Sequence, residues 1–286
     1  MSDTKTDTSN PELLVKEKLD ELVSFRKTTE SMHEFWSKQY DLGLAWVQFP
    51  TGSGGLDLNP KFQLMINETL RKEGISINNR IANILGIGMG APTIAEFGTE
   101  EQKNKYLRPM FAAEEIWCQM FSEPGSGSDL ASLSTKAVDD GDGYIVNGQK
   151  VWTTLGHLAK WGLLVARTDP NVPKHRGLTF FIVDMESEGV EVRPLRQITG
   201  EAEFNEVYFT DVKIPKENVL GEVGDGWRVS LAILMNERVA IGGNVRERGA
   251  GAPGHLVQLW KDKGLEDPVI KDQLMELWIQ QEAVRL

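Results

Sequence analysis

The sequence predicts an α+β protein of several domains, with an N-terminal helical domain, a middle β-sandwich or barrel, and the start of a C-terminal helical bundle. Three observations support this fold class. Apolar residues recur at helical spacing from Pro11 onwards, the spacing changes to that of short strands at Trp117, and helical spacing returns at Gly226. The predicted domains are residues 1–115, 116–222 and 223–286.

The composition limits the classes of partner and site. The chain of 286 residues carries a net charge of −11 without a Lys/Arg cluster, so neither nucleic acid nor a membrane surface is an expected partner. Cys118 is the only cysteine, which excludes an intramolecular disulfide and predicts a buried, unreactive side chain. The start, MSDTKTDTSNPELL, has no signal or transit pattern, and no apolar run approaches the ~20 residues that cross a bilayer. We therefore expect a cytoplasmic protein whose first ten residues form a tail.

The first domain is predicted to be helical. Thr99 and Gln102 have the spacing of a capping box, and Pro109 is expected to end the helix that they begin. A Pro/Gly-rich loop is expected between Leu42 and Leu58. Helices are expected over Pro11–Tyr40, Asn59–Leu70 and Pro92–Met110.

The run GIGMGA, residues 86–91, fits the loose G-x-G-x-x-G/A pattern of dinucleotide-binding folds. That pattern requires a preceding strand inside a βαβ unit, whereas NNRIANILG before it looks helical. We therefore interpret these glycines as positions that let helices pack closely.

The chain is organised around the stretch from Trp117 to Thr154. A strand is expected at its start, followed by the loop SEPGSGSD, residues 122–129, whose glycines allow a ligand close to backbone amides and hydroxyls. The second half predicts a turn at residues 139–143, a second turn at Asn147-Gly148 and a return strand that ends at Thr154. Later strands are expected over Leu163–Asp169, Leu178–Met185, Val190–Leu195 and Glu203–Pro215.

Strand alternation places Trp152 and Thr154 on one face of that return strand. A flat aromatic beside a hydroxyl suits a planar, hydrogen-bonding heterocycle. The alternative interpretation makes Trp152 a core tryptophan and the Ser/Gly loop an ordinary connection.

EPGSGSD followed by NGQKVWTT closely resembles the two flavin-binding signatures of the acyl-CoA dehydrogenase family, and the resemblance extends over nearly the whole chain. It implies FAD as cofactor, α,β-dehydrogenation of an acyl-CoA thioester to the trans-2-enoyl-CoA, electron-transfer flavoprotein as acceptor, and a homo- or heterotetramer. The segments GEAEFNEVYF and MNERV resemble bacterial members that act on bulky, branched or steroid side-chain acyl-CoAs. A non-catalytic scaffold subunit of a mixed tetramer is the alternative, and an oxidase of the same fold also stays open.

The resemblance assigns cofactor contacts by motif. Phe121 and Ser122 match family positions that contact the flavin ring, and Gln119 matches a further one where an aromatic is common. Trp152 and Thr154 match the flavin-packing tryptophan and the hydroxyl donor.

The resemblance also implies substrate contacts. Ser128 matches a position that contacts the acyl-CoA. Glu123, in the turn beside it, is expected to be structural. Metal ligation and a nucleophile elbow are not supported, because the histidines lack ligand spacing and the Ser/Gly loop precedes strands. Those histidines are His33, His157, His175 and His255.

Glu237 is the candidate base. The step Asn236-Glu237-Arg238 matches a helix in which some family members place the catalytic glutamate before an arginine, and Arg238 is then a substrate contact. Leu234 and Ile241 lie one turn to either side, so Glu237 is expected to border an apolar pocket. The alternative is a solvated helix glutamate, with the base in a later region as in many family members.

The last predicted helix begins at Asp267-Pro268 and has an apolar stripe that a single helix pair cannot cover. Acyl-CoA dehydrogenases continue with several more helices here. We therefore expect a C-terminal truncation at Leu286.

Overall fold

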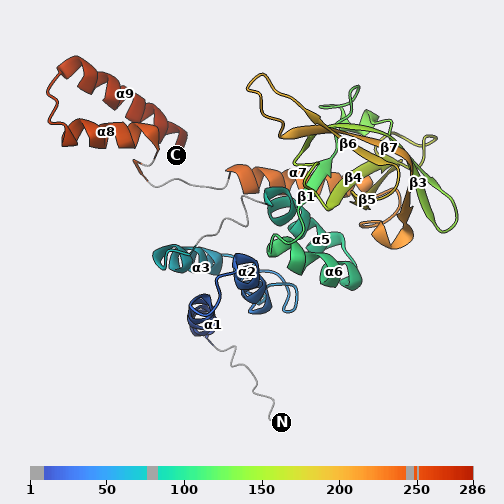
Figure 1. Ribbon diagram of the computed structural model, residues 1–286, viewed down its shortest axis with the longest axis horizontal. Helices are drawn as coiled ribbons and strands as arrows, with labels where there is room; N and C mark the ends of the chain where they lie inside the picture. The colour runs from blue at the N-terminus through green and yellow to red at the C-terminus, as the bar shows by residue number, and fades with distance from the viewer. Residues whose placement is uncertain (1–9, 76–82, 243–247, 250, 286) are drawn as a thin grey trace, which may run out of the picture. The chain divides into compact units, whose positions relative to one another are not determined.

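The computed structural model describes residues 10–75, 83–242, 248–249 and 251–285 (Figure 1). The chain divides into two compact units, Met1–Glu237 and Arg238–Leu286. The helices are α1 (Pro11–Arg26), α2 (Met32–Asp41), α3 (Lys61–Lys72), α5 (Ala91–Phe97), α6 (Glu100–Phe111), α7 (Gly226–Gly242), α8 (Ala252–Asp262) and α9 (Pro268–Arg285), with short turns η1 (Gly86–Gly90), η2 (Leu130–Ser132) and η3 (Lys216–Asn218). The strands are β1 (Trp117–Met120), β2 (Lys136–Asp139), β3 (Gly143–Thr154), β4 (Trp161–Arg167), β5 (Leu178–Asp184), β6 (Val190–Leu195) and β7 (Phe204–Pro215).

The first predicted helix is two helices. Asn10 caps α1 by accepting a hydrogen bond from the Leu13 N–H, and Pro11 occupies the first turn, where its missing N–H costs nothing. Ser31 caps α2 in the same way. Because a cap residue has extended backbone, Ser31 ends the continuous helix that the apolar spacing predicted from Pro11 to Tyr40.

Helix α6 confirms the predicted capping box. The Thr99 side chain accepts from the Gln102 N–H, and the Gln102 side chain accepts from the Thr99 N–H. The prediction that Pro109 ends this helix is wrong, because α6 continues to Phe111 with the proline inside it. The side-chain amide of Gln102 also donates hydrogen bonds to the carbonyls of Glu217 and Val219, at 2.8 Å each. These bonds link α6 to the segment that follows β7.

The run of residues 86–91 is a π-helical turn, η1, that continues directly into α5. Residues 84–85 before it are helical, so the strand that a dinucleotide-binding fingerprint needs does not precede it. A Cβ on Gly90 would lie 3.4 Å from Leu163 and 3.5 Å from Met110. These are ordinary van der Waals distances, so the space around Gly90 does not require glycine, and close helix packing at these glycines stays a prediction.

The β-strands form one seven-stranded mixed sheet in the order β1-β4-β2-β3-β7-β6, with β5 paired to β4. Alternate residues of β4 face two different cores. Leu163 belongs to the core shared with the N-terminal helices, and Leu164 belongs to the core enclosed by the curled sheet. Covering on both faces explains why β4 and β5 are continuous apolar runs. The predicted α+β fold class, with a helical domain followed by a β domain, is confirmed; the exact domain limits stay a prediction.

Strand β3 corrects the predicted second turn. It runs without interruption from Gly143 to Thr154 and pairs along its length with β7 (Figure 1). At Asn147-Gly148 the register shifts instead, and a Cβ on Gly148 would lie 2.5 Å from Thr135 Oγ1. The dipeptide therefore marks a bulge with a close approach rather than a hairpin end.

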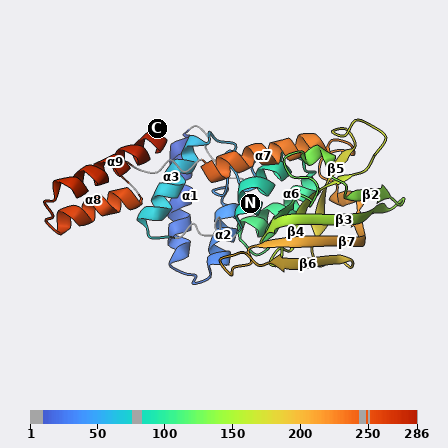
Figure 2. The same cartoon turned by 90° about the horizontal axis from the view of Figure 1, so that it is seen from above.

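In the second unit, α8 and α9 lie side by side (Figure 2). The predicted stripe on α9 is largely uncovered within this unit, since Ile270, Leu277 and Val284 are exposed. No helix in the described residues is long and apolar enough to cross a membrane. The predicted N-terminal tail and most of the apolar segment after Ile75 lie outside the described residues.

Candidate functional site

The first motif begins where β1 ends. Gln119 is half-buried and pairs with Leu163 of β4. Phe121 is buried against Phe180, with ring centroids 5.8 Å apart, and Ser122 is half-buried. Phe121 therefore offers its backbone rather than its ring to a ligand.

The loop that follows is braced from within. Glu123 and Ser126 exchange backbone hydrogen bonds of 2.8 and 3.1 Å, which closes a tight turn. Asp129 accepts from Lys174 at 2.7 Å and from Ser132 at 2.6 Å. Ser128 lies exposed between these two anchored points.

The second motif lies at the irregular end of β3. Between Lys150 and Thr153 the pairing with β7 gains one residue, and Trp152 takes a positive φ of 61°. The strand is therefore irregular at Trp152, and the prediction that Trp152 and Thr154 share one face stays a prediction. Thr153 is fully buried, whereas Trp152 is 61% exposed and Thr154 is half-buried. The alternative of a core tryptophan is wrong, because the indole is largely exposed and packs edge-on against Phe204, with ring centroids 6.0 Å apart.

The two motifs adjoin each other. The Val151 N–H donates to the Ser122 carbonyl at 2.9 Å, and Lys150 Nζ donates to the Phe121 carbonyl at 3.0 Å. The end of β1 thus lies directly beside the irregular segment that carries Trp152. The structure brings together the predicted cofactor contacts from both motifs.

A buried ion pair holds this junction. Lys150 is fully buried and donates to Glu123 Oε1 at 2.9 Å. Burial would raise the pKa of Glu123, but the Lys150 charge and hydrogen bonds from Thr135 and Ser134 lower that pKa to about 2. Burial lowers the pKa of Lys150 to about 8, against the opposing pull of Glu123. The prediction that Glu123 is structural is confirmed.

Several polar groups at the junction have no protein partner. In the described part of the chain, no residue hydrogen-bonds the Ser122 N–H, the Ser122 and Thr154 hydroxyls or the Gln119 amide. They lie on the two segments that adjoin at the junction, one of which carries the exposed indole of Trp152. The set fits an isoalloxazine ring, which is flat and has carbonyl and ring-nitrogen atoms along its edge.

The candidate base lies on another element. Glu237 is half-buried on α7, next to Asn236, whose amide donates to Thr93 Oγ1 of α5 at 3.5 Å. Among the described residues, no hydrogen bond joins Glu237 to β1 or β3. Arg238 is exposed, and the side chain of Ile241, which the predicted apolar border invoked, lies outside the described residues. The roles of Glu237, Arg238 and Ser128 stay predictions.

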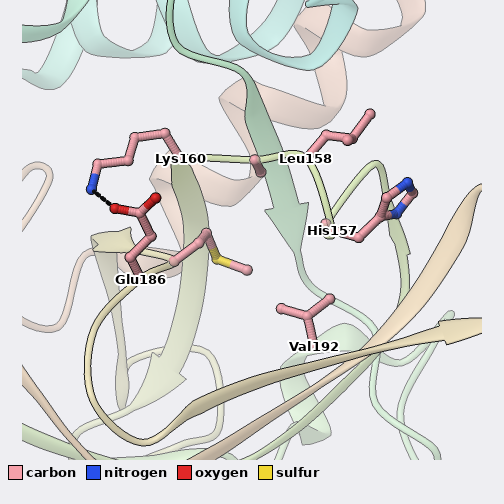
Figure 3. Close-up of a pocket in the computed structure, with 8 residues that line it drawn as sticks. His157, Leu158, Lys160, Glu186 and Val192 are labelled. Atoms are coloured by element: carbon pink, nitrogen blue, oxygen red, sulfur yellow. Dashed lines mark hydrogen bonds and ion pairs between the residues drawn. The ribbon is translucent and has the colours of Figure 1, made fainter.

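A hollow of about 340 Å³ opens where β3 leads into β4. Figure 3 shows Lys160 and Glu186 on one side of it and His157 on the other. Lys160 is already paired with Glu186 at 2.6 Å and with Asp184 at 2.9 Å. None of the site residues predicted from the sequence lines this hollow, and no group of His, Cys, Asp or Glu in the described residues has an arrangement that would hold a metal ion.

Two family models match successive parts of the chain. The acyl-CoA dehydrogenase N-terminal domain matches residues 12–114, and the acyl-CoA dehydrogenase middle domain matches residues 118–212. The chain belongs to the acyl-CoA dehydrogenase family. The resemblance of its two motifs to the family's flavin signatures is thereby supported by the domains that contain them.

Known relatives have names from the same family. The chain is 47% identical over 201 residues to acyl-CoA dehydrogenase FadE34 of Mycobacterium tuberculosis, which covers 70% of this chain and 28% of that protein. It is 38% identical over 246 residues to acyl-CoA dehydrogenase IpdE1 of the same organism, covering 85% and 63%. The solved structure of the Tcur3481-Tcur3483 steroid ACAD matches with a TM-score of 0.68 at 27% identity, covering 98% of this chain and 75% of that one. The chain thus spans less than two thirds of the length of these curated relatives.

Lys150 is the residue at the junction that motif matching missed. It lies inside NGQKVWTT but was assigned no role. A signal for it exists in the sequence, because Val146, Gly148 and Lys150 follow one another at strand period and a lysine at an inward position needs a buried partner.

Proposed function

We propose that this acyl-CoA dehydrogenase family member binds FAD and oxidises an acyl-CoA thioester to the trans-2-enoyl-CoA. The observation that supports it is the junction of the two motifs, where an exposed indole and unpartnered polar groups lie on adjoining segments. Trp152 is 61% exposed at this junction, which leaves its ring accessible to a planar ligand.

The cofactor would be held by residues from both motifs. Trp152 would cover the ring, and Thr154, Ser122 and Gln119 would hydrogen-bond its polar edge, with the Phe121 backbone beside it. Bound FAD supplies the electron sink for the hydride that leaves the β carbon. Exposed Gly125 and Gly127 leave the neighbouring loop open, since a Cβ at either would meet nothing within 4 Å.

Proton removal is assigned to Glu237. Its carboxylate accepts the α proton of the thioester, which is only weakly acidic, so donors must stabilise the developing enolate oxygen. Ser128 and Arg238 would contact the acyl-CoA.

The substrate is proposed to be a bulky acyl-CoA, such as one with a steroid side chain. Support comes from the Tcur3481-Tcur3483 structure, whose title names a steroid ACAD, together with the segments GEAEFNEVYF and MNERV. A panel of CoA thioesters with an artificial electron acceptor tests this. Strict preference for short straight chains would exclude the bulky substrate.

The partners are proposed by analogy with the family. Electron-transfer flavoprotein would accept the electrons, and the protein would form a homo- or heterotetramer in the cytoplasm. The solved ChsE4-ChsE5 complex of Mycobacterium tuberculosis, 30% identical to this chain, is an example of two related chains in one assembly. Mass measurement of the purified protein, alone and after co-expression with a related subunit, tests the assembly.

The decisive experiment is the visible absorption spectrum of the purified protein. We expect a flavin spectrum as isolated or after addition of FAD. Protein that is folded by circular dichroism yet takes up no FAD would instead be a non-catalytic scaffold subunit.

A further inference from the structure

In the peptide unit that joins Phe121 to Ser122, the carbonyl has a hydrogen-bond partner and the N–H has none among the described residues. Its carbonyl oxygen accepts from Lys150 Nζ at 3.0 Å. A trans peptide is planar, and its C=O and N–H groups point in opposite directions. The Ser122 N–H, which has no partner among the described residues, is therefore aimed away from Lys150.

We propose that Lys150, fixed by Glu123, is a positioning residue that sets the direction of the Ser122 N–H toward an acceptor atom on the edge of the flavin ring. This inference rests on the proposed function. It assigns to the buried ion pair a task at the cofactor beyond holding the fold.

Glu123 leaves the lysine little freedom. Its Oε2 accepts from the Ser134 N–H at 2.6 Å and the Ser134 hydroxyl at 2.7 Å, and its Oε1 accepts from the Thr135 N–H at 2.9 Å and from Lys150. Two of these donors are backbone groups, which cannot rotate away. The carboxylate is thus a fixed point, and the Lys150 ammonium bridges it to the Phe121 carbonyl.

The neighbouring peptide is fixed independently. The Ser122 carbonyl accepts from the Val151 N–H at 2.9 Å, and the Glu123 N–H donates to the Ser126 carbonyl at 2.8 Å. Loss of the Lys150 bond would therefore free one peptide unit to rotate while its neighbour stays in place. The expected defect is local to the Ser122 N–H.

The polar pair is not required for stability alone. Buried ion pairs can often be replaced by apolar or neutral groups of similar volume at no cost, whereas removal of one partner leaves a buried charge that destabilises strongly. A neutral replacement of both groups here would keep the packing but leave no donor for the Phe121 carbonyl. Stability and cofactor positioning can therefore be separated by experiment.

The test compares Lys150→Met with the double variant Lys150→Met/Glu123→Gln, using the dissociation constant for FAD, the flavin spectrum and the melting temperature of the apoprotein. We expect the single variant to lose both stability and FAD binding. The double variant should recover part of the lost melting temperature, because no buried charge is left unpaired, yet bind FAD about 10-fold more weakly, as for one lost hydrogen bond to the ring. The matched control is the exposed pair on α6, Lys103→Met/Glu100→Gln, which should change neither property.

A double variant that binds FAD with wild-type affinity and spectrum would overturn the positioning role and leave the proposed function intact. Wild-type protein that takes up no FAD would overturn both. Amide hydrogen exchange on the wild type gives a measurement that needs no variant. Saturation with FAD should slow exchange of the Ser122 N–H, and unchanged exchange there in FAD-loaded protein would also overturn the inference.

Discussion

Two glutamates of this chain differ in burial and in the element that carries them. Glu123, in the loop after β1, is buried and accepts hydrogen bonds on both oxygens from Ser134, Thr135 and Lys150. Glu237, near the end of α7, is half-buried and adjoins the boundary between the two compact units.

The comparison sets a structural carboxylate against the carboxylate that is proposed as the base. A carboxylate whose oxygens are all satisfied has a low pKa and does not take up protons near neutral pH, so it serves as a structural anchor. A general base must keep a lone pair available to the substrate. The hydrogen-bond partners of Glu123 explain its anchor role, whereas the role of Glu237 as the base stays a proposal.

The largest effect is expected at Glu237. Because proton removal occurs only in the transition state, Glu237→Gln should keep FAD and acyl-CoA binding while turnover falls by about 10²-fold or more. Steady-state kinetics with an artificial electron acceptor measures this. The exposed Glu276→Gln on α9 is a control that should retain turnover. Unchanged turnover in Glu237→Gln would mean that another residue is the base, and the contrast between Glu123 and Glu237 would no longer be one of role.

The next largest effect is expected at Trp152. This residue lies at the same junction as Glu123, but it is exposed whereas Glu123 is buried. Trp152→Ala should weaken FAD binding by about 10-fold or more, since aromatic stacking and its buried area are lost, with little change in melting temperature. Trp117, fully buried, is the matched control. Trp117→Ala should cost about 3–5 kcal/mol of unfolding free energy. If Trp152→Ala lost as much stability as Trp117→Ala, the indole would be structural.

The third effect is on the free energy of unfolding at acid pH. The folded-state pKa of Glu123 is about 2, below its ordinary value of 4.5, so its contribution to stability is present above about 4.5 and is lost as the pH falls toward 2. Denaturant unfolding as a function of pH should show a shallower loss in this window for Glu123→Gln than for wild type. Glu191→Gln, whose exposed partner is Arg193, should leave the slope nearly unchanged. Equal slopes for all three proteins would contradict the anchor role.

The smallest effect is expected at Ser128. Its hydroxyl has no partner in the described residues and lies on an exposed corner, so Ser128→Ala should leave folding and FAD binding intact. One neutral hydrogen bond to the acyl-CoA would be lost, which predicts a rise of about 2- to 10-fold in KM with kcat unchanged. The neighbouring exposed Ser132 accepts and donates within the loop and is not a clean control, whereas half-buried Ser187→Ala should have no effect on KM.

Much of the fold could be predicted because its signals are local. Capping at Thr99, helical spacing in α7 and strand period in β6 each depend on residues a few positions apart. Two errors were local, at the Ser31 cap and at Pro109, and the others occurred where distant residues decide. Asn147-Gly148 is a strong turn signal, but pairing with β7 and contact with Thr135 made it a bulge.

The candidate site divides in the same way. The motif residues Phe121, Ser122 and Trp152 were identified from the sequence, and the structure brings their segments together. The irregularity that exposes Trp152 could not be predicted, because it depends on register against β7. The role of Lys150 required its partner Glu123, which lies 27 positions away in the chain.

Because Trp152 has a positive φ, selection for stability and selection for flavin binding should favour different residues at position 152. A bulky residue in left-handed backbone costs of order 1–3 kcal/mol, a cost that glycine avoids and asparagine reduces. A directed-evolution screen that scores only heat resistance should therefore enrich Gly or Asn at position 152 and recover colourless clones. A screen that instead scores the yellow colour of bound flavin should retain the tryptophan.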